Sequence, residues 1–160
     1  MIATTGASLL PSEALHKLRT RLLPRATILT PNVPEAYCLL AADPSLNHDD
    51  DTVPMAPIEK ADDLETVARA VRRLGPKWVL VKGGHCPFRA DGTVARTEAE
   101  RELVVDVLVG GEGDEEVVVR VETGYCRSRH THGTGCSLAC EFFLLIFILF
   151  LQIFLSRSKM

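Results

Sequence analysis

Apolar residues recur at intervals of three to five positions in three stretches, a spacing that predicts helices burying one face. The predicted helices cover residues 12–23, 34–40 and 63–74. Their starts carry residues typical of helix N-termini: Ser12 as an N-cap, Pro34 in a first turn, and Asp62 or Asp63 as a cap. Pro24 should end the first helix and Gly75 the third.

Short continuous apolar runs between these helices predict buried strands at residues 26–30 and 78–81. Two later runs, 103–109 and 117–121, are also strand-like, and the glycine-rich segment between them predicts a hairpin turn. Strands that alternate with helices predict an α/β layer with right-handed crossovers and a mainly parallel sheet.

Three segments rich in glycine or polar residues follow these strands or precede helices: Thr30–Glu35, Val81–His85 and His132–Cys136. In open α/β sheets, ligands bind at the carboxyl ends of strands, so we expect all three segments at one edge. Each also has a purely structural interpretation. Asn32 and Glu35 have the spacing of a capping box, Gly83-Gly84 could form a plain turn, and Cys136 could be a small buried side chain.

The segment Gly133-Thr134-Gly135 has the composition of an anion site. Its glycines allow the backbone to turn tightly and bring N–H groups close to a ligand. A helix that begins near Cys136 would add its positive dipole end, which favours a phosphate and a thiolate.

The five cysteines are odd in number and follow no signal peptide, so we expect free thiols in a reducing compartment, the cytoplasm. A zinc site is a rival interpretation of four residues: Cys126, His130, His132 and Cys136. Their spacing, however, matches no structural-zinc pattern.

Charge and length narrow the functional classes. A length of 160 residues fits one domain, and a net charge of −3 without a basic patch gives no sign of nucleic-acid binding.

The last twenty residues, 141–160, differ in composition from the rest. Five of the six phenylalanines lie there, and Gln152 is the one polar residue from Phe142 to Leu155. This run is short for a bilayer, which needs about 20 apolar residues, and lacks an amphipathic pattern. We expect a tail that is not native to the preceding domain, translated from non-coding or frame-shifted DNA. A C-terminal membrane anchor is the alternative.

Four segments of the chain resemble the hydroxymethylpyrimidine/phosphomethylpyrimidine kinases of thiamine biosynthesis, a branch of the ribokinase-like superfamily. The matching segments are Met1–Gly6, Thr30–Ala36, Val79–His85 and Thr131–Leu138. The resemblance covers roughly residues 1–140. It implies part of a ribokinase-like three-layer α/β sandwich, its C-terminal half. Cys136, where most of the superfamily carries an acid, favours this branch over sugar kinases and pyridoxal kinases.

The resemblance also implies ATP- and Mg²⁺-dependent phosphorylation of hydroxymethylpyrimidine and of its monophosphate. By position, Cys136 would be catalytic beside the acceptor oxygen. An anion hole on the transferred phosphoryl group would come from Gly133, Thr134 and Gly135. Nucleotide phosphate would be contacted by Lys82, Thr134 and Asn32, and magnesium would be organised by Asn32 and Glu35.

In this family, further sequence normally precedes the position of Met1, and it supplies residues that hold the pyrimidine. We therefore expect this chain to be inactive or weak as an enzyme. The alternative is a non-catalytic fragment that binds nucleotide or pairs with a full-length relative. The resemblance implies a small-molecule substrate and leaves a homodimer open.

Overall fold

The structure is a computed structural model that describes residues 11–41, 57–111 and 115–127. The chain divides into two compact units, residues 1–125 and 126–160. Every helix and strand described below belongs to the first unit, and Cys126 and Arg127 are the described residues of the second.

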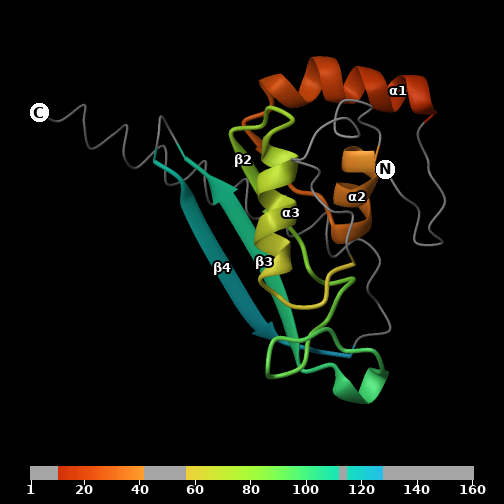
Figure 1. The fold of residues 1–160 in the computed structure, drawn as a ribbon, viewed down its shortest axis with the longest axis vertical. Helices are drawn as coiled ribbons and strands as arrows, with labels where there is room; N and C mark the ends of the chain where they lie inside the picture. The colour runs from red at the N-terminus through yellow and green to blue at the C-terminus, as the bar shows by residue number, and fades with distance from the viewer. Residues whose placement is uncertain (1–10, 42–56, 112–114, 128–160) are drawn as a thin grey trace, which may run out of the picture. The chain divides into compact units, whose positions relative to one another are not determined.

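The described residues form three α-helices and four strands (Figure 1). The helices are α1 (Ser12–Lys17), α2 (Val33–Ala41) and α3 (Asp63–Arg72). The strands are β1 (Ile28–Leu29), β2 (Trp78–Val81), β3 (Leu103–Gly110) and β4 (Val117–Gly124). Short helical turns follow α1 at Leu18–Leu22 and Leu23–Arg25, and another lies at Glu98–Glu100. All three predicted helices and all four predicted strands are therefore present, with shifted ends.

The strands form one sheet in the order β1-β2-β3-β4. β1 and β2 are parallel, and the connection between them carries α2 and α3, as the α/β pattern predicts. The β2–β3 and β3–β4 pairs are antiparallel, so the expectation of a mainly parallel sheet is wrong for the described strands. β3 and β4 are antiparallel because their connection is short, whereas a parallel pair needs a crossover of a dozen or more residues.

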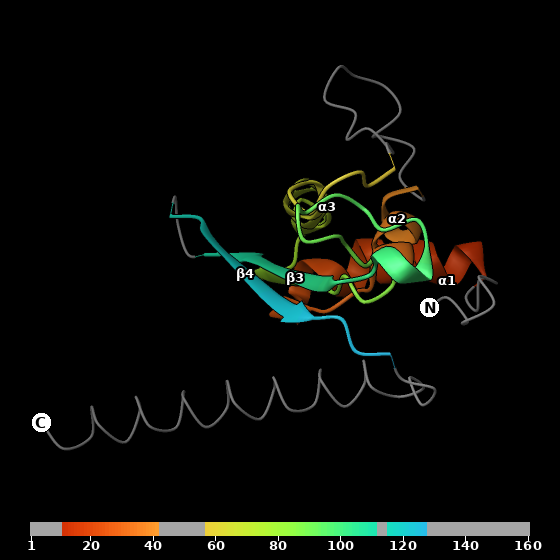
Figure 2. The ribbon, with the colours of Figure 1, turned by 90° about the horizontal axis from the view of Figure 1, so that it is seen from below.

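The main core lies between α3 and one face of the sheet. Figure 2 shows α2 and α3 on the same side of the strands. The buried face of α3 carries the residues that the helical spacing selects: Leu64, Val67, Ala68 and Val71. They pack with alternate residues of β3, namely Val105, Val107 and Val109, and with Val79 and Val81 of β2. The period of two in β3 and the period near 3.6 in α3 thus place their apolar residues in the same layer.

A smaller cluster, Leu15, Leu23 and Leu39, joins the first helix to α2. Two details of the predicted first helix are wrong. Its N-cap is Pro11 rather than Ser12, because the Pro11 carbonyl accepts the Leu15 N–H at 3.0 Å. The helix changes after Lys17 to a wider turn and then a tighter one, and Pro24 lies inside the last turn.

The face of the β3–β4 hairpin that is turned away from α3 is mainly apolar, and Asp106 is the charged residue of the two strands on it. Val107 of β3 is buried against α3 and pairs with Arg120, so Val119, one residue away on β4, lies on the opposite face. Val117, Val119 and Val121 are exposed there. Within the described ranges, none of the helices combines the length and apolar character that crossing a bilayer requires.

Candidate functional site

Two of the three predicted ligand-binding segments meet at one edge of the sheet. The parallel pairing of β1 and β2 continues beyond both strands to a bridge between Asn32 and Lys82. The Lys82 N–H donates to the Pro31 carbonyl at 2.9 Å. Both segments follow the carboxyl ends of their strands, as predicted. We call Asn32, Glu35, Lys82 and Gly83 the strand-end site.

Asn32 and Glu35 form a reciprocal capping box at the start of α2. The Asn32 N–H donates to Glu35 Oε2 at 3.0 Å, and the Glu35 N–H donates to Asn32 Oδ1 at 2.8 Å. The structural interpretation of this pair is therefore confirmed. It does not conflict with a ligand-binding role, because a carboxylate oxygen and an amide oxygen can each accept more than one interaction. The box holds both side chains at the edge of the sheet.

The chain turns tightly after Lys82. A Cβ atom on Gly83 would lie 2.0 Å from the Val105 carbonyl oxygen, whereas one on Gly84 would meet nothing within 4 Å. The Cys86 N–H closes the turn on the Gly83 carbonyl at 2.7 Å. Gly83 is thus required for close approach to β3, and Gly84 is not.

Asp106, in the middle of β3, contacts this turn and was not among the residues that the sequence singled out. Its Oδ1 accepts the Gly83 N–H at 2.8 Å. If the β2–β3 register is extended by one residue beyond the Val81–Val107 pair, Lys82 comes opposite Asp106. The signal in the sequence is an isolated acid in the apolar run Leu103–Val109.

The charge of Lys82 acts on two carboxyl groups of this region. Burial raises the pKa of the Asp106 carboxyl, and the Gly83 hydrogen bond and the Lys82 charge only partly offset this, so the pKa lies above its ordinary value. Burial also raises the pKa of Glu35, but its net pKa is lowered, and the Asn32 N–H and the Lys82 charge are among the influences that lower it. Glu35 is therefore ionised at neutral pH.

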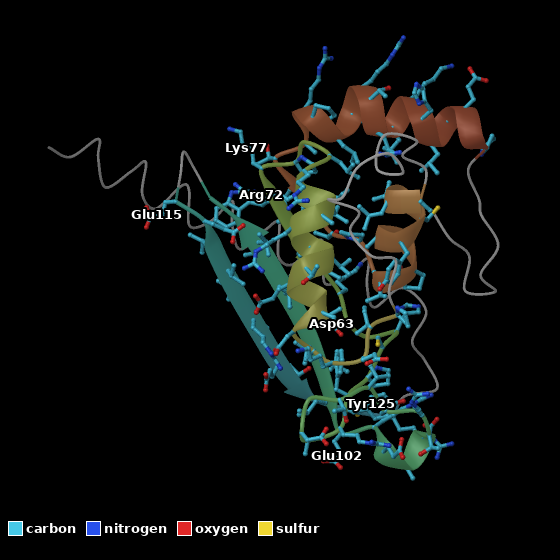
Figure 3. The ribbon with its side chains drawn as sticks, in the orientation of Figure 1. Asp63, Arg72, Lys77, Glu102, Glu115 and Tyr125 are labelled. Atoms are coloured by element: carbon cyan, nitrogen blue, oxygen red, sulfur yellow. The ribbon has the colours of Figure 1, made fainter. Side chains whose placement is uncertain are left out.

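The amino-terminal end of α3 lies at the same edge. The Cδ1 atom of Leu64 would be 3.5 Å from a Cβ atom on Gly83. In Figure 3, Asp63 marks this end of α3 and Arg72 the other. Asp63 Oδ2 accepts the Glu59 and Lys60 N–H groups at 2.9 and 3.0 Å, which fixes the loop before the helix.

Polar contacts hold the two ends of the hairpin. At one end, Arg72 donates to the Gly111 carbonyl at 3.3 Å. At the other, the Tyr125 N–H donates to the Glu102 carbonyl at 2.7 Å, and these two residues lie together in Figure 3. These contacts keep β3, and with it Asp106, in a fixed position beside the turn.

The third predicted segment lies outside the described residues. Gly133, Thr134, Gly135 and Cys136 therefore remain predictions, as does a domain boundary between residues 140 and 141. Of the rival zinc set, Cys126 is described and exposed, and the other three members are outside. In the described ranges, no group of three or more His, Cys, Asp or Glu residues could hold a metal ion.

Comparison with known proteins identifies relatives. Residues 1–142 match the family described as phosphomethylpyrimidine kinase. The hydroxymethylpyrimidine/phosphomethylpyrimidine kinase of Streptomyces coelicolor is 38% identical over 138 residues, which are 86% of this chain and 39% of the relative. The Bacillus subtilis enzyme of the same name is 32% identical over 139 residues, 87% of this chain and 40% of the relative.

Solved structures give the same fold. A pyridoxal kinase of B. subtilis, determined as an ADP complex, has a TM-score of 0.55 and 27% identity, over 85% of this chain and 40% of that one. A pyridoxal kinase of Staphylococcus aureus, in complex with AMP-PCP, has a TM-score of 0.55 and 20% identity, over 85% of this chain and 39% of that one. The predicted ribokinase-like α/β fold is confirmed.

These matches cover only part of each relative. This chain spans about two fifths of the length of the two curated enzymes and of the two solved pyridoxal kinases. The family match, in contrast, takes in most of this chain. The chain therefore belongs to the phosphomethylpyrimidine kinase family.

Proposed function

We propose that this chain carries part of a site that transfers a phosphoryl group from ATP to hydroxymethylpyrimidine and to its monophosphate. Family membership supports the reaction class. The observation that carries the proposal is the Asn32–Lys82 bridge, which brings a cation and the Asn32–Glu35 capping box to one strand edge. Phosphoryl transfer depends mainly on positioning and on neutralising phosphate charge, which such a group of residues can supply.

In this proposal, Lys82 contacts the nucleotide phosphates and Asn32 assists it. Their backbones are fixed to each other through Pro31, so both side chains leave the same edge. Removal of a hydrogen bond to a charged group typically costs about 1.5–3 kcal/mol, so Lys82 should contribute strongly to affinity.

The strand-end site also fits a magnesium ion. Mg²⁺ is usually bound through one or two carboxylates together with waters and substrate phosphates. The ionised Glu35 carboxylate and the Asn32 amide oxygen supply that donor set. Bound there, the ion would neutralise phosphate charge.

The rest of the proposed machinery comes from the family resemblance. Gly133, Thr134 and Gly135 would form the anion hole, and Cys136 would be the catalytic residue beside the acceptor oxygen. We further propose a cytoplasmic enzyme that acts on a small molecule, has no nucleic-acid partner and can form a homodimer.

A second candidate is nucleotide binding without turnover. The observation that favours it is the strand-end site itself, because the groups that the described residues bring together there, Lys82 and the Asn32–Glu35 pair, suit nucleotide phosphate and a metal ion. In this case the strand-end site would still bind nucleotide phosphate, and Lys82→Ala would weaken that binding about tenfold or more.

A coupled ATP-consumption assay on the 160-residue chain separates these candidates. Hydroxymethylpyrimidine is the test acceptor, and pyridoxal is the second acceptor because the B. subtilis pyridoxal kinase shares the fold at 27% identity. Turnover that depends on hydroxymethylpyrimidine and on Lys82 supports the kinase. Binding without turnover supports the second candidate, and pyridoxal-dependent turnover alone would overturn the substrate assignment.

A further inference from the structure

Asp106 is the one charged residue in the otherwise apolar run Leu103–Val109 of β3. The residue lies in the middle of β3, between the buried Val105 and Val107, and pairs with Val121 of β4. Its carboxylate is half-buried, and such burial is unfavourable unless the charge finds partners. The partner that the structure shows is the Gly83 N–H, 2.8 Å from Oδ1.

The peptides on both sides of Lys82 are thereby held. On one side, the Lys82 N–H donates to the Pro31 carbonyl at 2.9 Å. On the other, the Gly83 N–H donates to Asp106. With both peptide planes fixed, the direction in which the Lys82 side chain leaves the backbone is fixed as well.

The close packing of Gly83 explains why a glycine stands beside this anchor. The Gly83 Cα lies so near to the Val105 carbonyl that no side chain fits between them. Glycine has the largest conformational freedom of any residue, so a turn built on it depends on external contacts to keep one conformation. A hydrogen bond to an ionised acceptor is roughly twice as strong as one between neutral groups.

We propose that Asp106 is the positioning residue for Lys82, holding the Lys82–Gly83 peptide through the Gly83 N–H so that the ammonium group is directed at nucleotide phosphate. The inference rests on the proposed function of Lys82. In this role, Asp106 acts through the Gly83 peptide and not by contacting the nucleotide. Its ionised form also faces the Lys82 charge, which limits the cost of burying it.

Binding of ATP and of adenosine, measured by isothermal titration calorimetry, tests the proposal. Asp106→Ala should weaken ATP binding about tenfold or more, the effect of losing one charge-assisted hydrogen bond. Adenosine binding should stay unchanged, because adenosine has no phosphate for Lys82. Asp106→Asn should stay within about threefold of the parent chain, since its amide oxygen can still accept the Gly83 N–H.

A double-mutant cycle separates positioning from general damage to the fold. In the Lys82→Ala background, Asp106→Ala should change ATP affinity less than about twofold, because the residue acts through the missing lysine. Asp91→Ala is the matched control. Its carboxylate also accepts a backbone N–H, that of Thr93 at 2.9 Å, but in an exposed turn.

Amide hydrogen exchange at Gly83 provides a readout that needs no nucleotide. Exchange should be slow in the parent chain and in Asp106→Asn, and at least tenfold faster in Asp106→Ala. If the parent chain fails to bind ATP, the proposed function fails, and unchanged Gly83 exchange in Asp106→Ala would separately refute the anchor.

Three results overturn the inference. They are additive effects of Asp106→Ala and Lys82→Ala on ATP affinity, equal loss of ATP and adenosine binding, and loss of ATP binding in Asp106→Asn with Gly83 still protected. The test with Asp106→Asn remains valid even if Asp106→Ala does not fold, because it uses only the parent chain and the Asn variant.

Discussion

The geometry of the strand-end site depends on individual atomic contacts of Gly83, which approaches the Val105 carbonyl and donates its N–H to Asp106. Asn32, Glu35 and Lys82 could be predicted from the sequence because each directly follows a strand or begins a helix, where side chains reach the edge of a sheet. Asp106 could not, because alternation in β3 predicts only which face it lies on, not that a glycine N–H from another strand end reaches it.

Gly83→Ala should destabilise the protein, whereas Gly84→Ala should not. A methyl group on Gly83 would overlap the Val105 carbonyl oxygen, while the same group on Gly84 meets open space. Overpacking of this kind costs typically about 1–3 kcal/mol. Urea unfolding followed by the fluorescence of the single tryptophan, Trp78, measures the difference. Equal unfolding midpoints for the two variants would contradict the close approach of the turn to β3.

Glu100 should give the fold a pH-dependent contribution. Its carboxylate accepts the Arg89 guanidinium at 2.6 Å and the Arg96 and Thr97 N–H groups at 2.9 and 3.2 Å, which lowers its pKa to about 2. Because the folded pKa lies below the unfolded value of about 4.3, the contribution is fully present above that value. It is lost as the pH falls toward about 2.

Thermal melts of the parent chain and Glu100→Gln between pH 2 and pH 7 measure this contribution. The midpoints should differ most at neutral pH and converge in acid. Glu98→Gln, which removes one exposed ion pair with Arg101, should lower the neutral midpoint less. A constant difference across the whole pH range would argue against an ionised Glu100 in this network.

Among the elements, α3 followed its sequence pattern most closely. Its apolar positions recur at helical spacing, its first turn carries Asp63, and Gly75 with a φ of 118° follows its end. The segment after α1 did not follow the prediction. Leucines at positions 18, 22 and 23 keep a helical spacing, so the sequence gives no sign that the backbone widens and then tightens.

Leu64→Ala should destabilise the protein strongly through the packing of α3. Leu64 is fully buried at the end of α3 beside Gly83, and truncation of a buried leucine costs about 2–5 kcal/mol. Leu22→Ala is the control, because Leu22 is 60% exposed. Trp78 fluorescence during urea unfolding again reports the change. A Leu64→Ala variant as stable as Leu22→Ala would place the core elsewhere than between α3 and the sheet.

At the scale of the whole molecule, the fold class could be predicted from the order of elements, but the sheet could not. The crossover through α2 and α3 specifies the parallel β1–β2 pair, and the hairpin specifies β3–β4. The antiparallel pairing of β2 with β3 spans the long polar segment 82–102, whose composition does not determine where β3 returns.

The convergence of two separate strand ends is the central claim, and affinity for nucleotide tests it most directly. Titration of MgATP into the 160-residue chain should show saturable binding. Lys82→Ala should weaken that binding about tenfold or more, the effect of removing one charged contact. Lys77→Ala removes the same charge at the opposite end of β2 and should leave affinity unchanged. No binding by the parent chain, or equal losses in the two lysine variants, would contradict the account.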